Sequence, residues 1–279
     1  MSTVDIAHLR EWVGQTRTDH DILSSRHARL MAATLGLAQS GLVEGAALPP
    51  LWHWLYFLSG EPPAALGRDG HPARGGFLPP VTLPNRMWAG GQLEFHAPVP
   101  LDARVEKHST VVSVDHKQGR SGELVFVKVR HELLHAGNRV LTEHHDIVYK
   151  GATATGSAAA NVGIPAAQHS RRIEPDATML FRYSALTFNG HRIHYDADYC
   201  REVEGYPNLV IHGPLNATLL AAFAQEVSGR PVKTFSYRGL KPAMVGNALT
   251  LNAAHDGDRL VLWVALPHGS MSMRADATF

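Results

Sequence analysis

Hydrophobic residues recur with a helical period at one place in each half of the chain. The stripe of the first half, at spacings i, i+3, i+4 and i+7, comprises Leu51, Trp54, Leu55 and Leu58. Two prolines precede it, and proline suits the start of a helix. The stripe of the second half, closed by a glycine at 229, comprises Leu215, Leu219, Phe223 and Val227. Each stripe predicts a helix with one buried face.

Runs rich in β-branched and aromatic residues follow each predicted helix. They cover residues 105–149 in the first half, and 234–238, 248–255 and 259–266 in the second. Turn signals separate them at 117–122, at 136–138 and at Asp256-Gly257, a dipeptide typical of tight hairpins. The pattern predicts an antiparallel meander after each helix. A further helix over residues 21–37 is expected to pack outside the first meander.

The chain divides at a segment rich in small residues. Residues 152–170 have neither a helical nor a strand period, so we interpret them as a linker. The total of 279 residues exceeds the usual size of a single core, whereas the flanking segments 1–151 and 171–279 are each of ordinary domain size. A helix followed by a meander, present twice, predicts an α+β protein in which two antiparallel sheets are each wrapped around a central helix.

Composition narrows the function classes. The chain is 44% hydrophobic and 18% charged, which is typical of a globular protein. Lys plus Arg number 26 against 25 for Asp plus Glu, so no broad basic field exists for nucleic acid. No run of 18 apolar residues occurs, so we expect no membrane partner. The single cysteine, Cys200, fits a reducing compartment, and a cytoplasmic location is the expectation.

The most specific signal lies in two stretches, FRYSALTFNGHRIHYD at 181–196 and VIHGPLNATLL at 210–220. They resemble the signature of the MaoC-like, or hydratase 2, family, in which Asp-x-Asn-Pro-x-His-x-Asp precedes a His-Gly step that opens a central helix. Aligned without gaps, the family's catalytic histidine falls on His194 and its first aspartate on Asn189, while His212 and Gly213 match the His-Gly step. The resemblance implies a double hot-dog fold and a hydratase or dehydratase that acts on acyl-CoA thioesters without a cofactor.

The residues of the motif are similar to those of one subgroup of this family. SALTFNGHRIHYD, together with RMWAGGQLEFHAP at 86–98, resembles the hydratases of mesaconyl-C4-CoA, 3-methylfumaryl-CoA and itaconyl-CoA, and the mitochondrial-type hydroxyacyl-thioester dehydratases. The likeness implies hydration of a branched C5 dicarboxylic enoyl-CoA, itaconyl-CoA or mesaconyl-C4-CoA, to citramalyl-CoA, as in itaconate degradation. Family analogy also implies a homodimer or higher homo-oligomer.

The hydration reaction suggests a catalytic role for each of these residues. Hydration of a double bond next to a thioester requires a base for water, an acid for the α-carbon and donors for the enolate oxygen. His194 titrates near neutrality and is the candidate base. Asn189 is expected to hold the water or the histidine, and the Gly213 N–H, at a helix start, to bind the thioester oxygen. The candidate substrate-binding residues are His191, Arg192, His212, Arg86 and Arg238.

One departure from the family pattern leaves the mechanism open. Asn189 stands where the family has an acid, and an amide does not exchange protons at ordinary pH. Either His194 acts alone through the water, or a neighbour supplies the second group. The candidates on the same segment are His191, Tyr195 and Asp196.

Other interpretations compete with a C5 hydratase. The same fold accommodates a dehydratase for linear 3-hydroxyacyl thioesters, a thioesterase, or an acyl-CoA binding module that has lost its acid at Asn189.

His191 and His194 have the spacing of a metal pair but no third ligand at suitable spacing, so no metal site is expected. Residues 143–146, EHHD, are interpreted as a solvated strand, because adjacent strand residues point to opposite faces.

Overall fold

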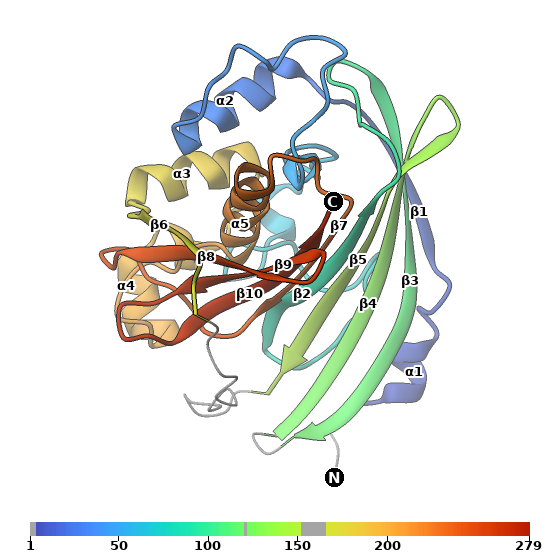
Figure 1. The fold of residues 1–279 in the computed structure, drawn as a ribbon. Coiled ribbons are helices and arrows are strands. Elements are labelled where there is room, and N and C mark those ends of the chain that lie inside the picture. The colour runs from blue at the N-terminus through green and yellow to red at the C-terminus, as the bar shows by residue number, and fades with distance from the viewer. Residues whose placement is uncertain (1–3, 120–121, 152–165) are drawn as a thin grey trace.

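The computed structural model describes residues 4–119, 122–151 and 166–279. Within these ranges ten strands form one antiparallel sheet in the order β1-β3-β4-β5-β2-β7-β10-β9-β8-β6 (Figure 1). The strands are β1 (Thr16–Ile22), β2 (Asn85–Phe95), β3 (Arg104–Gly119), β4 (Gly122–His135), β5 (Asn138–Lys150), β6 (His169–Ile173), β7 (Thr234–Gly239), β8 (Leu249–Asp256), β9 (Arg259–Ala265) and β10 (Met271–Thr278). The helices are α1 (Ile6–Arg10), α2 (Ser25–Leu35), α3 (Ala177–Leu186), α4 (Ala197–Tyr199) and α5 (Gly213–Ser228).

The two halves of the chain meet at the centre of the sheet. β2, the last strand of the first half in the strand order, pairs with β5 on one side and with β7 of the second half on the other. At this seam Leu93 lies opposite Phe235, and both side chains are buried. The two sheets expected from the sequence are therefore continuous.

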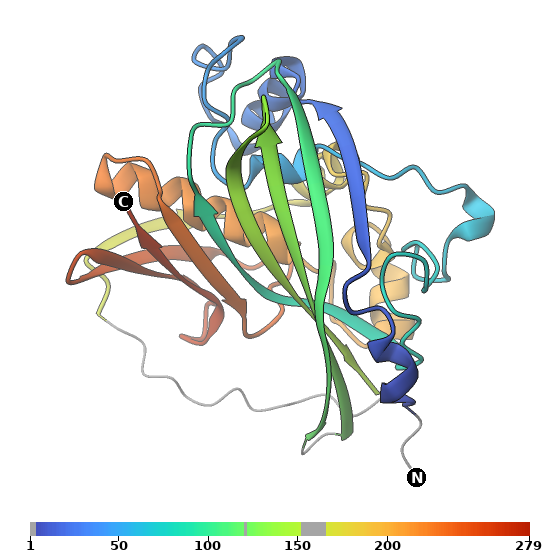
Figure 2. The same cartoon turned by 90° about the vertical axis from the view of Figure 1, so that its right-hand side faces the viewer.

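Helix α5 is the central helix of the second half. It packs against β7, β8, β9 and β10, which curve around it (Figures 1 and 2). Leu215 and Phe223 of the predicted stripe are buried, and the helix ends at Gly229, which has a left-handed φ of 66°. The prediction of this helix and of the Gly229 stop is confirmed.

The helix expected over Leu51 to Leu58 is wrong. The chain forms only a 3-10 turn, η1 (Trp52–Leu55), between left-handed backbone at Leu51 (φ 69°) and Phe57 (φ 57°). Leu51 and Leu55 of the predicted stripe are buried, whereas Leu58 is 42% exposed. Trp52 is buried together with Leu55, because an i, i+3 spacing suits a 3-10 turn. No long helix lines the sheet of the first half within the described residues, so α5 has no counterpart there.

The strand predictions are partly confirmed. Residues 105–149 form β3, β4 and β5, and the second half contains β7, β8 and β9 close to the expected bounds. The helix expected over 21–37 is present as α2 (Ser25–Leu35), but residues 21–22 end β1, because this polar segment pairs with β3 as an edge strand. His169 and Ser170, assigned to the linker, belong to β6, and residues 152–165 lie outside the described ranges. Strands β1, β2, β6 and β10 were not expected.

The interpretation of residues 143–146 as a solvated strand is wrong at Glu143. This side chain is 1% exposed, because β5 is an interior strand and η1 covers the face that Glu143 occupies. Its carboxylate accepts hydrogen bonds from His53 Nε2 and Trp54 Nε1, each at 2.8 Å, and from His145 Nε2. The core of the first half therefore contains a buried carboxylate held by three donors.

Among the described residues, no helix has the length and apolar character needed to cross a bilayer.

Candidate active site

The motif that resembles the family signature forms a tight loop after α3. Asp176 caps this helix by accepting a hydrogen bond from the Met179 amide at 2.7 Å. The loop after the helix closes through the Asn189 amide, which donates to the Ser184 carbonyl at 2.8 Å. A 3-10 turn, η3 (Arg192–His194), then carries His194 into the protein, where it is 6% exposed.

The ring of His194 is fixed by two neighbours. Its Nδ1–H donates to the Val210 carbonyl at 2.7 Å, which leaves Nε2 as the proton acceptor. The ring also stacks on His212, with ring centroids 3.5 Å apart and planes inclined by 19°. His212 is completely buried, and its Nε2 is hydrogen-bonded to Ser184 Oγ at 2.8 Å. The structure thus brings the two predicted histidines into direct contact.

Both stacked histidines are neutral at physiological pH. Burial lowers the pKa of His194 to about 4, against the raising effect of its bond to the Val210 carbonyl. Burial, followed by the charges of His194 and His191, holds the pKa of His212 well below its usual range. A neutral imidazole with a free Nε2 is the form that a base requires.

Gly213 opens helix α5 directly beside this pair. Its N–H belongs to the helix start, where amides lack intrahelical acceptors and the helix dipole is positive. A Cβ added at Gly213 meets no atom within 4 Å, so open space lies next to this residue. His212 Nδ1 and Asn216 Oδ1, both buried in the same turn, have no hydrogen-bond partner among the described residues. This helix start therefore combines free polar atoms with room for a ligand.

Asn189 has a local role in the structure. Its Oδ1 accepts a hydrogen bond from the His191 amide at 3.0 Å, which closes an Asx turn. The side chain is half-buried, and no hydrogen bond joins it to His194. Asn189 shapes the loop that carries the histidines.

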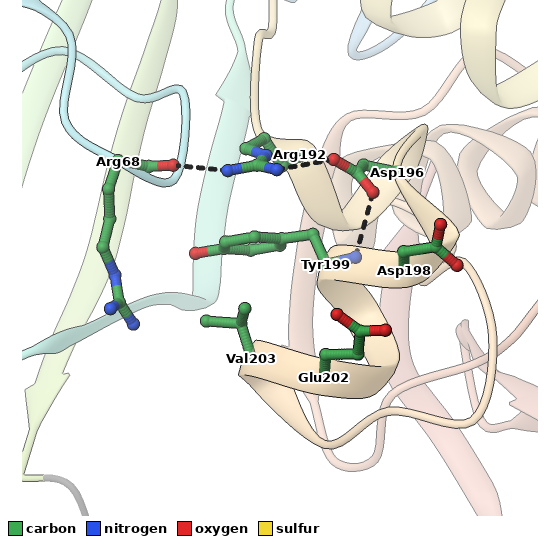
Figure 3. Close-up of a pocket in the computed structure, with 7 residues that line it drawn as sticks. All are labelled: Arg68, Arg192, Asp196, Asp198, Tyr199, Glu202 and Val203. Carbon is green, nitrogen blue, oxygen red and sulfur yellow. Dashed lines mark hydrogen bonds and ion pairs between the residues drawn. The ribbon is translucent and has the colours of Figure 1, made fainter.

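Arg192, another predicted site residue, is held in ionic and stacking contacts. Its guanidinium lies 2.7 Å from Asp196 Oδ2 and stacks on the Tyr199 ring at 4.2 Å. Figure 3 shows these groups among the residues that line a hollow of about 460 Å³. His194 does not line this hollow, and three of its lining residues are carboxylates, Asp196, Asp198 and Glu202. Arg68 lines the hollow as well, so the lining combines two arginines with three carboxylates.

The other two predicted arginines occupy different positions. Arg86 of β2 is half-buried, hydrogen-bonds the Tyr149 phenol, and is close enough to His191 to lower the pKa of that histidine. No carboxylate among the described residues forms an ion pair with Arg86. Arg238 of β7 is exposed, whereas its neighbour Tyr237 is buried. Adjacent strand residues point to opposite faces, so Arg238 lies on the solvent side of β7, whereas His194 is buried.

Comparison with known proteins agrees with this geometry. A family model described as hydroxyacyl-thioester dehydratase type 2 matches residues 51–245. The chain belongs to this family. It is 40% identical to the mesaconyl-C(4)-CoA hydratase of Chloroflexus aurantiacus over 266 residues, 95% of each chain. It is 28% identical to the mitochondrial hydroxyacyl-thioester dehydratase type 2 of Schizosaccharomyces pombe, over 78% of this chain and 80% of that one.

Solved structures confirm the fold. A MaoC-like dehydratase from Phytophthora capsici aligns with a TM-score of 0.73 at 11% identity, over 99% of this chain and 98% of that one. A Mycobacterium tuberculosis protein described as having a double hotdog fold aligns with a TM-score of 0.58 at 15% identity, over 95% and 96% of the two chains. The double hot-dog expectation is confirmed, and the protein is an enzyme of the hydratase and dehydratase type.

Two residues that the sequence did not single out contact the loop of the motif. They are Asp69 and His71, from the first half of the chain, whose ring lies 4.1 Å from that of His191. The donor atoms of these three residues lie within 4.8 Å of one another, a spacing that a metal ion could bridge. However, Asp69 Oδ2 and His71 Nδ1 are already hydrogen-bonded to each other at 3.2 Å. We therefore describe them as a carboxylate–imidazole pair.

Proposed function

We propose that the protein adds water to the double bond of a branched C5 dicarboxylic enoyl-CoA, converting mesaconyl-C4-CoA or itaconyl-CoA to citramalyl-CoA. The observation that carries this proposal is the 40% identity to a mesaconyl-C(4)-CoA hydratase over 95% of both chains. Relatives that are 28% identical are named as hydroxyacyl-thioester dehydratases, so a linear 3-hydroxyacyl thioester is the second candidate substrate.

His194 is the base in this proposal. Its Nδ1–H is engaged with the Val210 carbonyl, so Nε2 accepts a proton from the water that attacks the β-carbon. The stack on His212 and the hydrogen bond to Val210 hold the ring in one orientation, so little reorganisation accompanies proton transfer.

The start of α5 binds the thioester oxygen. Charge develops on this oxygen as the electrons of the double bond move toward the carbonyl, and an N–H at a helix start stabilises such charge. The Gly213 N–H has open space beside it, as a thioester requires. His212 precedes Gly213, and its burial fixes the position of this turn.

Arg86 binds the free carboxylate of the substrate. A dicarboxylic acyl group brings a second negative charge into the site, which requires a cation that no protein carboxylate already neutralises. Arg86 meets this condition among the described residues and lies near His191. A guanidinium can form paired hydrogen bonds with a carboxylate. Linear acyl chains offer no such group, so Arg86 contributes to selectivity.

The test compares four thioesters by absorbance at the enoyl-thioester band. Mesaconyl-C4-CoA, itaconyl-CoA, citramalyl-CoA and crotonyl-CoA are each mixed with the wild-type protein and with Arg86→Gln. We expect turnover of the C5 compounds by the wild type. We expect Arg86→Gln to raise KM for them roughly 10- to 100-fold, as for loss of a hydrogen bond to a charged group. Crotonyl-CoA turnover should not change.

Arg104→Gln is the matched control, because Arg104 is exposed on β3. Turnover of crotonyl-CoA without turnover of any C5 compound would contradict the proposed substrate and support a linear acyl chain. Binding of all four thioesters without turnover would support a binding module, and release of free CoA thiol would support a thioesterase. We further expect a cytoplasmic protein that elutes on sizing as a homodimer or larger assembly.

A further inference from the structure

A loop from the first half of the chain packs against the motif loop. It runs from Leu66 to Pro72, which are joined by a β-bridge, and the Gly67 amide donates to the His71 carbonyl at 2.7 Å. The Arg192 amide donates to the Asp69 carbonyl at 2.9 Å, which ties this loop to η3. The two halves of the chain thus meet through a main-chain hydrogen bond close in sequence to His194.

Two glycines allow this close approach. Gly70 has a φ of +84°, and a Cβ placed there would lie 2.0 Å from the Gly190 carbonyl oxygen. A Cβ at Gly190 would lie 2.9 Å from the Gly70 carbonyl oxygen. Neither backbone position has room for a side chain, so the two loops are in direct main-chain contact.

The contact positions Asp69 and His71 against the histidines of the motif. Asp69 accepts two hydrogen bonds from His71, from its amide at 3.1 Å and from its Nδ1 at 3.2 Å. The carboxylate therefore fixes the ring of His71 and leaves Nε2 free. The ring lies 4.1 Å from that of His191, which in turn lies 5.4 Å from that of His194. His71 is close enough to His194 for its charge to contribute to lowering the pKa of His194.

The other candidates for the second proton-handling group are engaged or unsuitable. Asp196 caps α4 through the Tyr199 amide and pairs with Arg192. Tyr195 is 52% exposed and donates its hydroxyl to the Gly190 carbonyl. Burial, followed by the charges of His71 and His194, lowers the pKa of His191 to about 3, so it carries no proton to donate at neutral pH.

We propose that His71, oriented by Asp69, is the second catalytic group, the acid that serves the α-carbon in place of the acid missing at Asn189. This inference rests on the proposed hydratase function. As water forms its bond to the β-carbon, one proton passes to His194 Nε2 and the electrons of the double bond pass to the α-carbon and the thioester oxygen. The His71 imidazolium then gives a proton to the α-carbon. His194 releases its proton to solvent and His71 takes one up, so one water is added in total.

The electrostatic surroundings of His71 come from three segments. Asp69 faces it from its own loop, and His191 and His194 face it from the motif loop. Arg86 of β2 acts on His191, and the charge of Arg192 is neutralised by Asp196. Asp69 is thus the one carboxylate hydrogen-bonded to His71 among the described residues.

The test measures the pH dependence of kcat for hydration of mesaconyl-C4-CoA by wild type, His71→Gln and Asp69→Asn. Glutamine retains a donor for Asp69 but exchanges no proton. We expect kcat of His71→Gln to fall roughly 10²- to 10⁴-fold, the usual contribution of an acid or base. We expect its rate to lose the decline at high pH that deprotonation of the acid causes. In Asp69→Asn we expect kcat to fall less than in His71→Gln, because the ring stays in place but loses the carboxylate that orients it.

Controls separate the possible outcomes. His268→Gln and Asp115→Asn alter exposed residues distant in sequence from the site and should match wild type in rate and pH profile. A His71→Gln enzyme that melts like wild type and retains both rate and alkaline decline would overturn the inference. Loss of activity on chelation, restored by a divalent metal, would also overturn it in favour of a metal site. If the wild type hydrates none of the C5 thioesters, the proposed function fails instead.

Discussion

At the scale of single residues, the environment of His194 determines the pH range in which the enzyme works. Burial lowers the pKa of His194 to about 4, although the reference value of histidine is about 6.5. The base therefore stays neutral as pH falls through 6. We expect kcat/KM for hydration to remain level on the acid side down to about pH 5 and to fall around pH 4. An acid decline centred near pH 6.5, reversible on return to pH 7, would contradict this assignment.

Glu143 is a second residue whose burial has a measurable consequence. Burial raises the pKa of its carboxylate, but the charges and hydrogen bonds of His145 and His53 hold this pKa well below the usual range. Removing one member of a buried ionic cluster typically costs about 3–5 kcal/mol. Glu143→Gln should therefore lower the free energy of unfolding by roughly that amount in urea denaturation. Glu106→Gln alters a half-exposed pair with His108 and should cost less than about 1 kcal/mol.

Sequence reasoning identified residues inside the motif and missed their partners. His194, His212 and Gly213 could be named because they stand in one short stretch with a recognisable order. Asp69 and His71 lie more than 100 positions away in a glycine-rich loop, and their role depends on a contact between the two halves of the chain. Glu143 was misread because alternation along a strand does not reveal which face is covered.

At the scale of elements, the docking of the 66–72 loop can be tested without altering a titratable group. In Gly70→Ala the new methyl group would collide with the Gly190 carbonyl, and the left-handed backbone would be strained. We expect kcat to fall at least 10-fold while the melting temperature changes by a few degrees at most, because the loop lies outside the sheet. Gly60→Ala has no atom within 4 Å of the new Cβ and serves as the control. Unchanged kcat in Gly70→Ala would show that loop docking is unimportant.

The contrast between α5 and η1 shows what periodicity can predict. Both stripes have apolar residues at helical spacing, yet only the second forms a long helix. The segment of α5 contains several alanines and leucines and is closed by Gly229, whereas the segment of η1 is rich in aromatic residues. His53 and Trp54 of η1 are also held by Glu143, a contact distant in sequence. Periodicity predicted the burial of Leu51 and Leu55 in the first segment and of Leu215 and Phe223 in the second, but it was wrong at Leu58, because tertiary contacts determined the conformation.

At the scale of the whole molecule, the buried histidines couple stability to pH. The pKa of His194 is about 4 and that of His191 about 3 in the folded protein, below the value of about 6.5 in an unfolded chain. As pH falls from 6.5 toward 4, the unfolded chain takes up protons that the folded protein does not, so the free energy of unfolding decreases. We expect His194 alone to lower the free energy of unfolding by a value on the order of 3 kcal/mol across this pH range. Urea denaturation at pH 7, 5.5 and 4 measures this change in the free energy of unfolding.

The variant His194→Gln provides the comparison for this effect. It removes one titrating group, so its stability should depend less steeply on pH than that of the wild type. Equal slopes in the two proteins would contradict the pKa assigned to His194.

Family resemblance and the repeated plan of helix and meander predicted the double fold at this scale. The pairing of β2 with β7 could not be predicted, because neither strand carries a signal for its partner.

The most direct test of the central claim is the rate of hydration of mesaconyl-C4-CoA by wild type and His194→Ala, followed at the enoyl-thioester band. His268→Ala, an exposed histidine in the turn between β9 and β10, is the control. We predict turnover by the wild type and the control, and a kcat lower by roughly 10²- to 10⁴-fold in His194→Ala with the fold retained. Equal turnover in all three proteins, or none in the wild type, would contradict the assignment of this enzyme and its base.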